Sequence, residues 1–483
     1  MDQSAEVNLI KSLVAAHFKV YEVKVSYETI ELLVTPEQST LEQNFEALRR
    51  DLYSRGYIPV LEYSGGEYKI TVLRKPPLPK RRNWLNLAFL TATILTTVYT
   101  GTILYASYSN QSQALSLENV VMGALTFALP LMLILGAHEL SHYFMSKRHD
   151  LDASLPYFIP AWPPIGTFGA FISMREPMPN KKALVDIGVA GPIAGLLMSI
   201  PILIIGLLLN AGATPNPDAV PAGQLAINTP LLFDLFMFLL PIPEGAVLHP
   251  MAFAAWVGIF VTAINLLPAG QLDGGHIARG LLGKNAIFLS FATVALLLIL
   301  GFVFYLGWLL FAFLIIVLGL NHPAPLNDVS KLDTKRIAVG AFAVVLLVSS
   351  FVFVPIYQIP YVDTFDMKVE GNNETNISPG GQALFFVSVQ NTGTMNISVQ
   401  LDVQNVPAGW TAIIYQSGSS STGATNSLLL PVPYSKNATV ILEIVVPAGE
   451  SQKTRVLTLK GQTSDTRASE HTIAYQDFTI HVS

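Results

Sequence analysis

The sequence contains no cysteine, and few of its residues carry a charge. Without cysteine the chain has no disulfide, no thiol nucleophile and no sulfur ligand, so a metal site must use His, Asp or Glu. Only 13% of the 483 residues are Asp, Glu, Lys or Arg, whereas 51% are hydrophobic. With a mean hydropathy of +0.47, this composition excludes an ordinary soluble enzyme and predicts a helical membrane protein with several spans.

Two further features are missing. The net charge is −5 and no basic tract is long enough to indicate a nucleic-acid partner, so we exclude nucleic acid. The first residues lack the charged and then apolar pattern of a secretory signal, and they lack the Arg- and Ser-rich pattern of a transit peptide. We therefore expect insertion into the lipid bilayer to begin at an internal segment.

Apolar runs of roughly 17 to 25 residues are long enough to cross a bilayer. They predict about seven spans, near residues 84–106, 119–145, 184–209, 251–269, 285–302, 304–320 and 336–357. Residues 107–118 and 210–250 contain no Lys or Arg, whereas basic residues flank the alternate loops: Lys80, Arg81, Arg82, Lys147, Arg148, Lys181, Lys182, Arg279, Lys284, Lys331, Lys335 and Arg336. Because positive residues stay on the cytoplasmic side, we expect a cell-membrane protein with a cytoplasmic N-terminus and an extracellular C-terminus.

Soluble domains are predicted on both sides of the spans. Residues 1–78 contain helix-like and alternating runs, which predict a small cytoplasmic α+β domain of order αββαββ. Residues 84–357 form the predicted transmembrane domain. Residues 364–483 alternate polar and apolar positions between turn signals, which is typical of an all-β Ig-like sandwich. Asn-x-Ser/Thr acceptors on the predicted outer side agree with this topology, at Asn110, Asn373, Asn376, Asn396 and Asn437.

The chemistry is concentrated in Gly136 to Met145, GAHELSHYFM, inside a long apolar run. On a helix, His138 and His142 lie one turn apart on the same face, so both imidazoles can reach one metal ion, with Glu139 beside it. Ionisable groups cost roughly 2.5 to 3.5 kcal/mol each at the centre of a membrane helix, so their presence indicates function. This arrangement is that of a zinc-dependent hydrolase.

A third ligand is predicted in the stretch from Asn265 to His276, NLLPAGQLDGGH, where an apolar segment is broken by proline and glycine. Asp273 is the candidate, because a catalytic zinc site usually takes three protein ligands and leaves a position for water. A turn role for Asp273 remains the alternative, and His276 is a second candidate ligand. Asn265 either stabilises a developing oxyanion or makes a helix–helix hydrogen bond.

These residues predict a metalloendopeptidase holding one Zn²⁺, in which Glu139 acts as the general base. Two other classes remain open. A membrane non-haem iron oxygenase also uses two histidines and a carboxylate, although such proteins show several His clusters. A metal transporter would be expected to show internal repeats and polar residues along several spans.

The two motifs resemble those of the site-2 protease family of intramembrane zinc metalloproteases, HExxH and NxxPxxxLDG, over residues 84–320. The resemblance is closest to the archaeal and plant plastid branch. It implies that His138, His142 and Asp273 bind zinc, that Glu139 is the base, and that transmembrane proteins are the substrates. Gly166-Thr-Phe-Gly169 resembles the family's membrane-embedded loop, which implies substrate binding at Gly166, Phe168 and Gly169.

The loop at 210–250 is too short for the PDZ domain of many relatives, and its stretch 230–243 predicts an interfacial helix instead.

Overall fold

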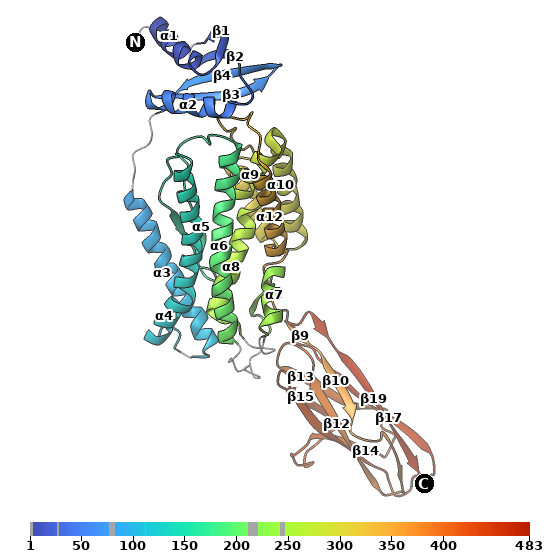
Figure 1. Cartoon of the computed structure of the whole chain (residues 1–483). Helices are drawn as coiled ribbons and strands as arrows, with labels where there is room; N and C mark the ends of the chain where they lie inside the picture. The colour runs from blue at the N-terminus through green and yellow to red at the C-terminus, as the bar shows by residue number, and fades with distance from the viewer. Residues whose placement is uncertain (1–2, 27–28, 77–82, 112, 211–220, 242–246) are drawn as a thin grey trace. The chain divides into compact units, whose positions relative to one another are not determined.

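The computed structural model describes residues 3–26, 29–76, 83–111, 113–210, 221–241 and 247–483. The chain divides into two compact units (Figure 1). One comprises Met1–Ala213 and Thr229–Val354, and the other comprises Thr214–Asn228 and Pro355–Ser483. Lys80, Arg81 and Arg82, which predicted the cytoplasmic side of the first span, lie outside the described residues.

The first unit begins with an α+β domain in the predicted order αββαββ. Its elements are α1 (Gln3–Ala15), β1 (Lys19–Val25), β2 (Thr29–Thr35), α2 (Leu41–Ser54), β3 (Tyr57–Ser64) and β4 (Glu67–Arg74). The strands form an antiparallel sheet in the order β1-β2-β4-β3. Gly65 and Gly66, both at positive φ, make the predicted hairpin turn. Helix α2 buries Phe45, Leu48 and Leu52, spaced three and four residues apart, in the core of this domain.

The rest of the unit is helical. Its helices are α3 (Asn83–Tyr108), α4 (Leu117–Gly123), α5 (Leu129–Arg148), α6 (Lys181–Asn210), α7 (Leu231–Leu239), α8 (Pro250–Asn265), α9 (Asp273–Leu282), α10 (Ala286–Val303), α11 (Gly307–Leu318) and α12 (Thr334–Ser350). A π-helical turn, Ala124–Ala128, joins α4 to α5, and a 3₁₀ turn, Gly283–Asn285, joins α9 to α10. Helix α6 packs against α5, α8 and α9, which brings the predicted ligand segments together (Figure 1).

Within the described residues, four helical stretches are long and apolar enough to cross a membrane: Asn83–Tyr108, Leu117–Arg148, Lys181–Asn210 and Asp273–Val303. Helices α8 and α11 are apolar but shorter, with 16 and 12 residues. The predicted helical run over 336–357 was wrong at its end. Helix α12 stops at Ser350 and the chain becomes extended at Phe351. In a continued helix, the ring of Pro355 would clash with the carbonyl group of Phe351, four residues earlier.

The second unit is rich in β-structure, as predicted. Its larger sheets have the orders β10-β12-β16-β14 and β11-β19-β17-β13-β15, and they share one apolar core. The strands are β7 (Leu225–Ile227), β8 (Ile356–Gln358), β9 (Val362–Asp363), β10 (Phe365–Val369), β11 (Glu374–Ile377), β12 (Gln382–Asn391), β13 (Ile397–Gln404), β14 (Thr411–Gln416), β15 (Ser427–Val432), β16 (Asn437–Val445), β17 (Thr454–Gln462), β18 (Glu470–His471) and β19 (Ile473–Val482). Alternate residues of these strands are buried, which explains the period-two pattern of the sequence.

Candidate metal centre

Helix α5 carries the two predicted histidine ligands. His138 and His142 lie four residues apart, so their rings are on one face of the helix, with ring centroids 5.0 Å apart. Both side chains are buried. The Nδ1 atom of His142 lies 2.8 Å from the backbone oxygen of Ile187 on α6. As the donor in this bond, Nδ1 orients the ring and leaves Nε2 free to bind a metal.

The third predicted ligand follows an irregular segment after α8. The segment from Leu266 to Leu272 joins helix α8 to helix α9, and Gly270 within it has a φ of +53°. A Cβ atom on Gly274 would lie 2.1 Å from the Leu266 oxygen, so this close approach requires glycine. The amide of Gly270 donates to Ser290 Oγ on α10 at 3.2 Å, which satisfies a buried polar group. Asp273, predicted to lie within the break, is instead the first residue of helix α9.

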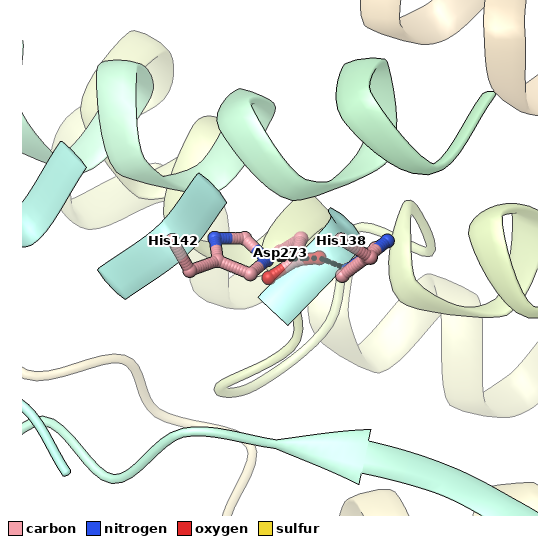
Figure 2. Close-up of side chains that lie close together, drawn as sticks. All are labelled: His138, His142 and Asp273. Carbon is pink, nitrogen blue, oxygen red and sulfur yellow. Dashed lines mark hydrogen bonds and ion pairs between the residues drawn. The ribbon is translucent and has the colours of Figure 1, made fainter. Parts of the chain in front are cut away.

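Asp273 joins the two histidines at one point, where the three side chains face one another (Figure 2). Its Oδ2 atom lies 3.1 Å from His138 Nε2 and 3.2 Å from His142 Nε2. All three potential ligand atoms lie within 4.8 Å of one another. Zinc takes two imidazole nitrogens and a carboxylate oxygen at roughly 2.0 to 2.2 Å each, and the three residues fit such an ion. His138, His142 and Asp273 therefore form a possible metal site.

Glu139 and Asn265, the other predicted catalytic residues, lie beside this site. Glu139 is buried, and its Oε1 atom is 4.0 Å from His138 Nε2. Asn265 is the last residue of α8, and its Nδ2 atom lies 3.2 Å from His138 Nε2. Two polar side chains thus adjoin the ligands without belonging to the set of three.

Two glycines of α6 form part of the site, and sequence reasoning assigned them no role. A Cβ atom on Gly191 would lie 2.1 Å from His142 Nε2 and 2.7 Å from His138 Cδ2. A Cβ atom on Gly195 would lie 3.0 Å from His138 Nδ1. Their spacing, four residues apart on an apolar helix, is typical of close helix packing and was the available signal.

The predicted substrate-binding loop forms a two-stranded sheet of β5 (Tyr157–Pro160) and β6 (Thr167–Phe171). Gly166 precedes β6 at positive φ, and its oxygen accepts a hydrogen bond from Thr96 Oγ1 at 2.7 Å. Phe168 is 71% exposed, and Gly169, also at positive φ, follows it. Strand β6 packs beside α5, the helix that carries Glu139.

His276, the second candidate for a ligand, stays outside the set of three. It lies one turn after Asp273 on α9, and its Nδ1 atom is 2.6 Å from Nε2 of His322. The Nδ1 atom of His322 in turn lies 2.7 Å from the oxygen of Pro323. The pair therefore connects α9 to the segment after α11.

Together, the apolar helices and the buried His-His-Asp set define a membrane metalloprotein with a hydrolase-type motif. Comparison with known families gives the narrower class. Residues 126–308 match Peptidase family M50. The chain thus contains a Peptidase M50, or site-2 protease, domain, and it is homologous to the EGY zinc metalloproteases. The match agrees with the predicted resemblance, and the relatives named zinc metalloproteases agree with the predicted Zn²⁺.

Three plant relatives illustrate the homology. Probable zinc metalloprotease EGY1, chloroplastic, from Arabidopsis thaliana is 33% identical over 237 residues, which cover 47% of this chain and 42% of the relative. EGY2 from the same plant is 31% identical over 255 residues, covering 50% and 42%. Rice EGY3 (Oryza sativa subsp. indica) is 30% identical over 284 residues, covering 54% and 48%. The match thus spans less than half the length of each relative.

Proposed function

We propose that the chain is an intramembrane zinc metalloendopeptidase that hydrolyses peptide bonds within transmembrane segments of other membrane proteins. The observation that carries the proposal is the convergence of His138, His142 and Asp273 within 4.8 Å, inside helices apolar enough to cross a membrane. Buried ionisable groups are costly in such helices, so a functional role is the simplest explanation for their presence. The Peptidase family M50 match over the same residues supports the assignment.

In the proposed mechanism, His138, His142 and Asp273 would hold Zn²⁺, which would serve as the Lewis acid that activates water and polarises the scissile carbonyl. Glu139 accepts the proton of the attacking water at a carboxylate oxygen and delivers it to the leaving amine nitrogen. Its position one residue from His138, with Oε1 4.0 Å from Nε2, supports this role.

Asn265 and strand β6 have proposed roles in binding the substrate. The Nδ2 atom of Asn265 lies 3.2 Å from a ligand nitrogen, close enough to donate to a substrate carbonyl oxygen. A transmembrane helix hides its carbonyls in hydrogen bonds and must unwind before cleavage. In the described part of the chain β6 pairs with one strand, β5, so its other edge is available to an extended substrate. Phe168 and Gly169 belong to this strand, and Gly166 directly precedes it.

The test is cleavage of a transmembrane reporter by the purified full chain in proteoliposomes. We expect wild type to cleave it, chelator to stop cleavage, and Glu139→Gln to abolish cleavage while retaining zinc. Glu118→Gln is the matched control, because Glu118 is an exposed carboxylate on the same apolar stretch. Cleavage by the Glu139→Gln protein at the wild-type rate would show that the proposed mechanism is wrong.

The topology is also a proposal: seven spans, a cytoplasmic N-terminus, an Ig-like sandwich outside the cell, and residence in the cell membrane. The basic residues around Lys147, Lys181 and Lys331 support it. Helix α11 has 12 residues, about 18 Å, so it needs adjoining residues or a thinned bilayer to cross. Because the chain has no cysteine, Lys331→Cys and Asn437→Cys report sidedness by labelling with an impermeant maleimide. We expect labelling from opposite sides.

A further inference from the structure

The segment from Leu326 to Asp328, after α11, continues the sheet of the N-terminal domain. The amide of Leu61 on β3 donates to the Leu326 oxygen at 2.7 Å, and the Asp328 amide donates to the Leu61 oxygen at 3.4 Å. On its other side, the Leu326 amide donates to the Met178 oxygen at 2.8 Å. Asn327 accordingly forms parallel bridges with Leu61 and with Asn180. The segment thus lies between β3 and the residues that lead into α6.

Side chains strengthen this connection. Leu326 is 2% exposed and belongs to the core of the N-terminal domain, and Val329 packs against that core. The Oδ1 atom of Asn327 accepts the amides of Val329 and Ser330 at 3.1 and 3.0 Å, which fixes the turn that follows. The connection between the N-terminal domain and the helices therefore combines apolar burial with backbone pairing.

The same segment holds helix α9, which carries Asp273. Asp328 accepts two hydrogen bonds from Arg279, from Nη1 to Oδ1 at 3.0 Å and from Nη2 to Oδ2 at 2.9 Å. The side chains of Arg279 and Asp328 are 5% and 13% exposed. A two-bonded guanidinium–carboxylate pair fixes orientation as well as distance, and burial protects it from screening by salt.

We propose that Arg279 and Asp328 are positioning residues for the metal centre, and that the N-terminal domain holds them in place. Strand β3 fixes the segment, Asp328 fixes Arg279, and Arg279 sets the rotation of α9 that turns Asp273 toward His138 and His142. Arg279 lies six residues after Asp273, so a rotation of α9 at one residue moves the other. The inference rests on the proposed function only in taking this site as a zinc site.

The test compares Asp328→Asn, which keeps the shape of the side chain and removes its charge, with Asp150→Asn in the full-length protein. Asp150 is the matched control, because its exposed pair with Arg50, at 3.2 Å, also joins the N-terminal domain to the helices but does not contact α9. Zinc affinity is measured by chelator competition, and the order of α9 by hydrogen exchange. We expect Asp328→Asn to weaken zinc binding about 10- to 100-fold and to speed exchange in α9, and Asp150→Asn to match wild type.

Leu326→Ala provides a second variant if Asp328→Asn does not yield folded protein. It loosens the segment without touching Arg279 or a ligand, and we expect it to shift zinc affinity and α9 exchange in the same direction. Wild-type zinc affinity in a folded Asp328→Asn or Leu326→Ala protein would overturn the inference. A wild-type protein that binds zinc but cleaves no reporter would count against the proposed function alone.

Discussion

Replacing Gly191 with alanine tests how tightly helix α6 presses on the metal ligands. The added Cβ atom would lie 2.1 Å from His142 Nε2 and 2.6 Å from His142 Cδ2. Ordinary van der Waals contact begins near 3.4 Å, so the ring must move by about 1.3 Å. The ring cannot move freely, because its Nδ1 atom is bonded to the Ile187 oxygen. We expect Gly191→Ala to weaken zinc binding about 10- to 100-fold, which is the range typical of mutations that disturb the orientation of a metal-binding side chain.

Two other glycines calibrate the experiment. Gly195→Ala places its Cβ atom 3.0 Å from His138 Nδ1, and we expect a smaller loss of zinc affinity. Gly136→Ala, on the ligand helix itself, meets no atom within 4 Å and should bind zinc like wild type. Alanine stabilises a helix by roughly 1 kcal/mol relative to glycine, so neither substitution should destabilise its helix through a lower helix propensity.

The assay is competition with a chelator of known zinc affinity on detergent-purified protein, with thermal unfolding of each variant measured in parallel. The expected order of zinc affinity is Gly136→Ala, then Gly195→Ala, then Gly191→Ala as the weakest. If Gly191→Ala binds zinc as tightly as Gly136→Ala, then α6 does not constrain the ligands as described.

Further predictions concern the ligands and the N-terminal domain. Asp273→Ala should lose bound zinc, whereas Asn265→Ala should retain it and lose cleavage, as measured by metal analysis beside the reporter assay. Adding zinc at 100 times its dissociation constant should stabilise the apo wild-type protein by about 2.7 kcal/mol in thermal unfolding, and Asp273→Ala should respond much less. Hydrogen bonds from Arg74 and Tyr57 lower the pKa of Glu6 below its usual 4.5. Their stabilisation is present above that pH and lost as pH falls through the lowered value, so Glu6→Gln should reduce the acid sensitivity of hydrogen exchange in α1 and β4.

Much of the metal centre could be predicted because its residues have fixed local spacing. His138 and His142 share a helix face whatever surrounds the helix, and Asp273 stood out as a carboxylate beside a break in an apolar run. The prediction placed Asp273 within the irregular segment, whereas Asp273 is the first residue of helix α9. Proline and glycine marked that segment, but whether the next residue begins a helix depends on packing against α6 and α10.

Contacts between distant segments could not be predicted in this way. Gly191 lies close to the histidines only because α6 packs against α5, and a small residue in an apolar helix has many possible partners. Likewise, the sequence PLND around Leu326 is ordinary loop composition. Its pairing with Leu61 depends on β3 having a free edge, which is a property of the folded sheet. Periodicity indicates the elements, but not these partners.

Helix α9 shows why the N-terminal domain and the metal centre are best understood together. The helix has 10 residues, about 15 Å, and a 3₁₀ turn, Gly283–Asn285, joins it to α10. Two further contacts hold it. Gly274 and Gly275 press its first turn against the irregular segment, and Arg279 joins its other end to Asp328. Since Asp273 is part of this helix, whatever holds Arg279 also limits where the third ligand can be, and the N-terminal domain is part of that restraint.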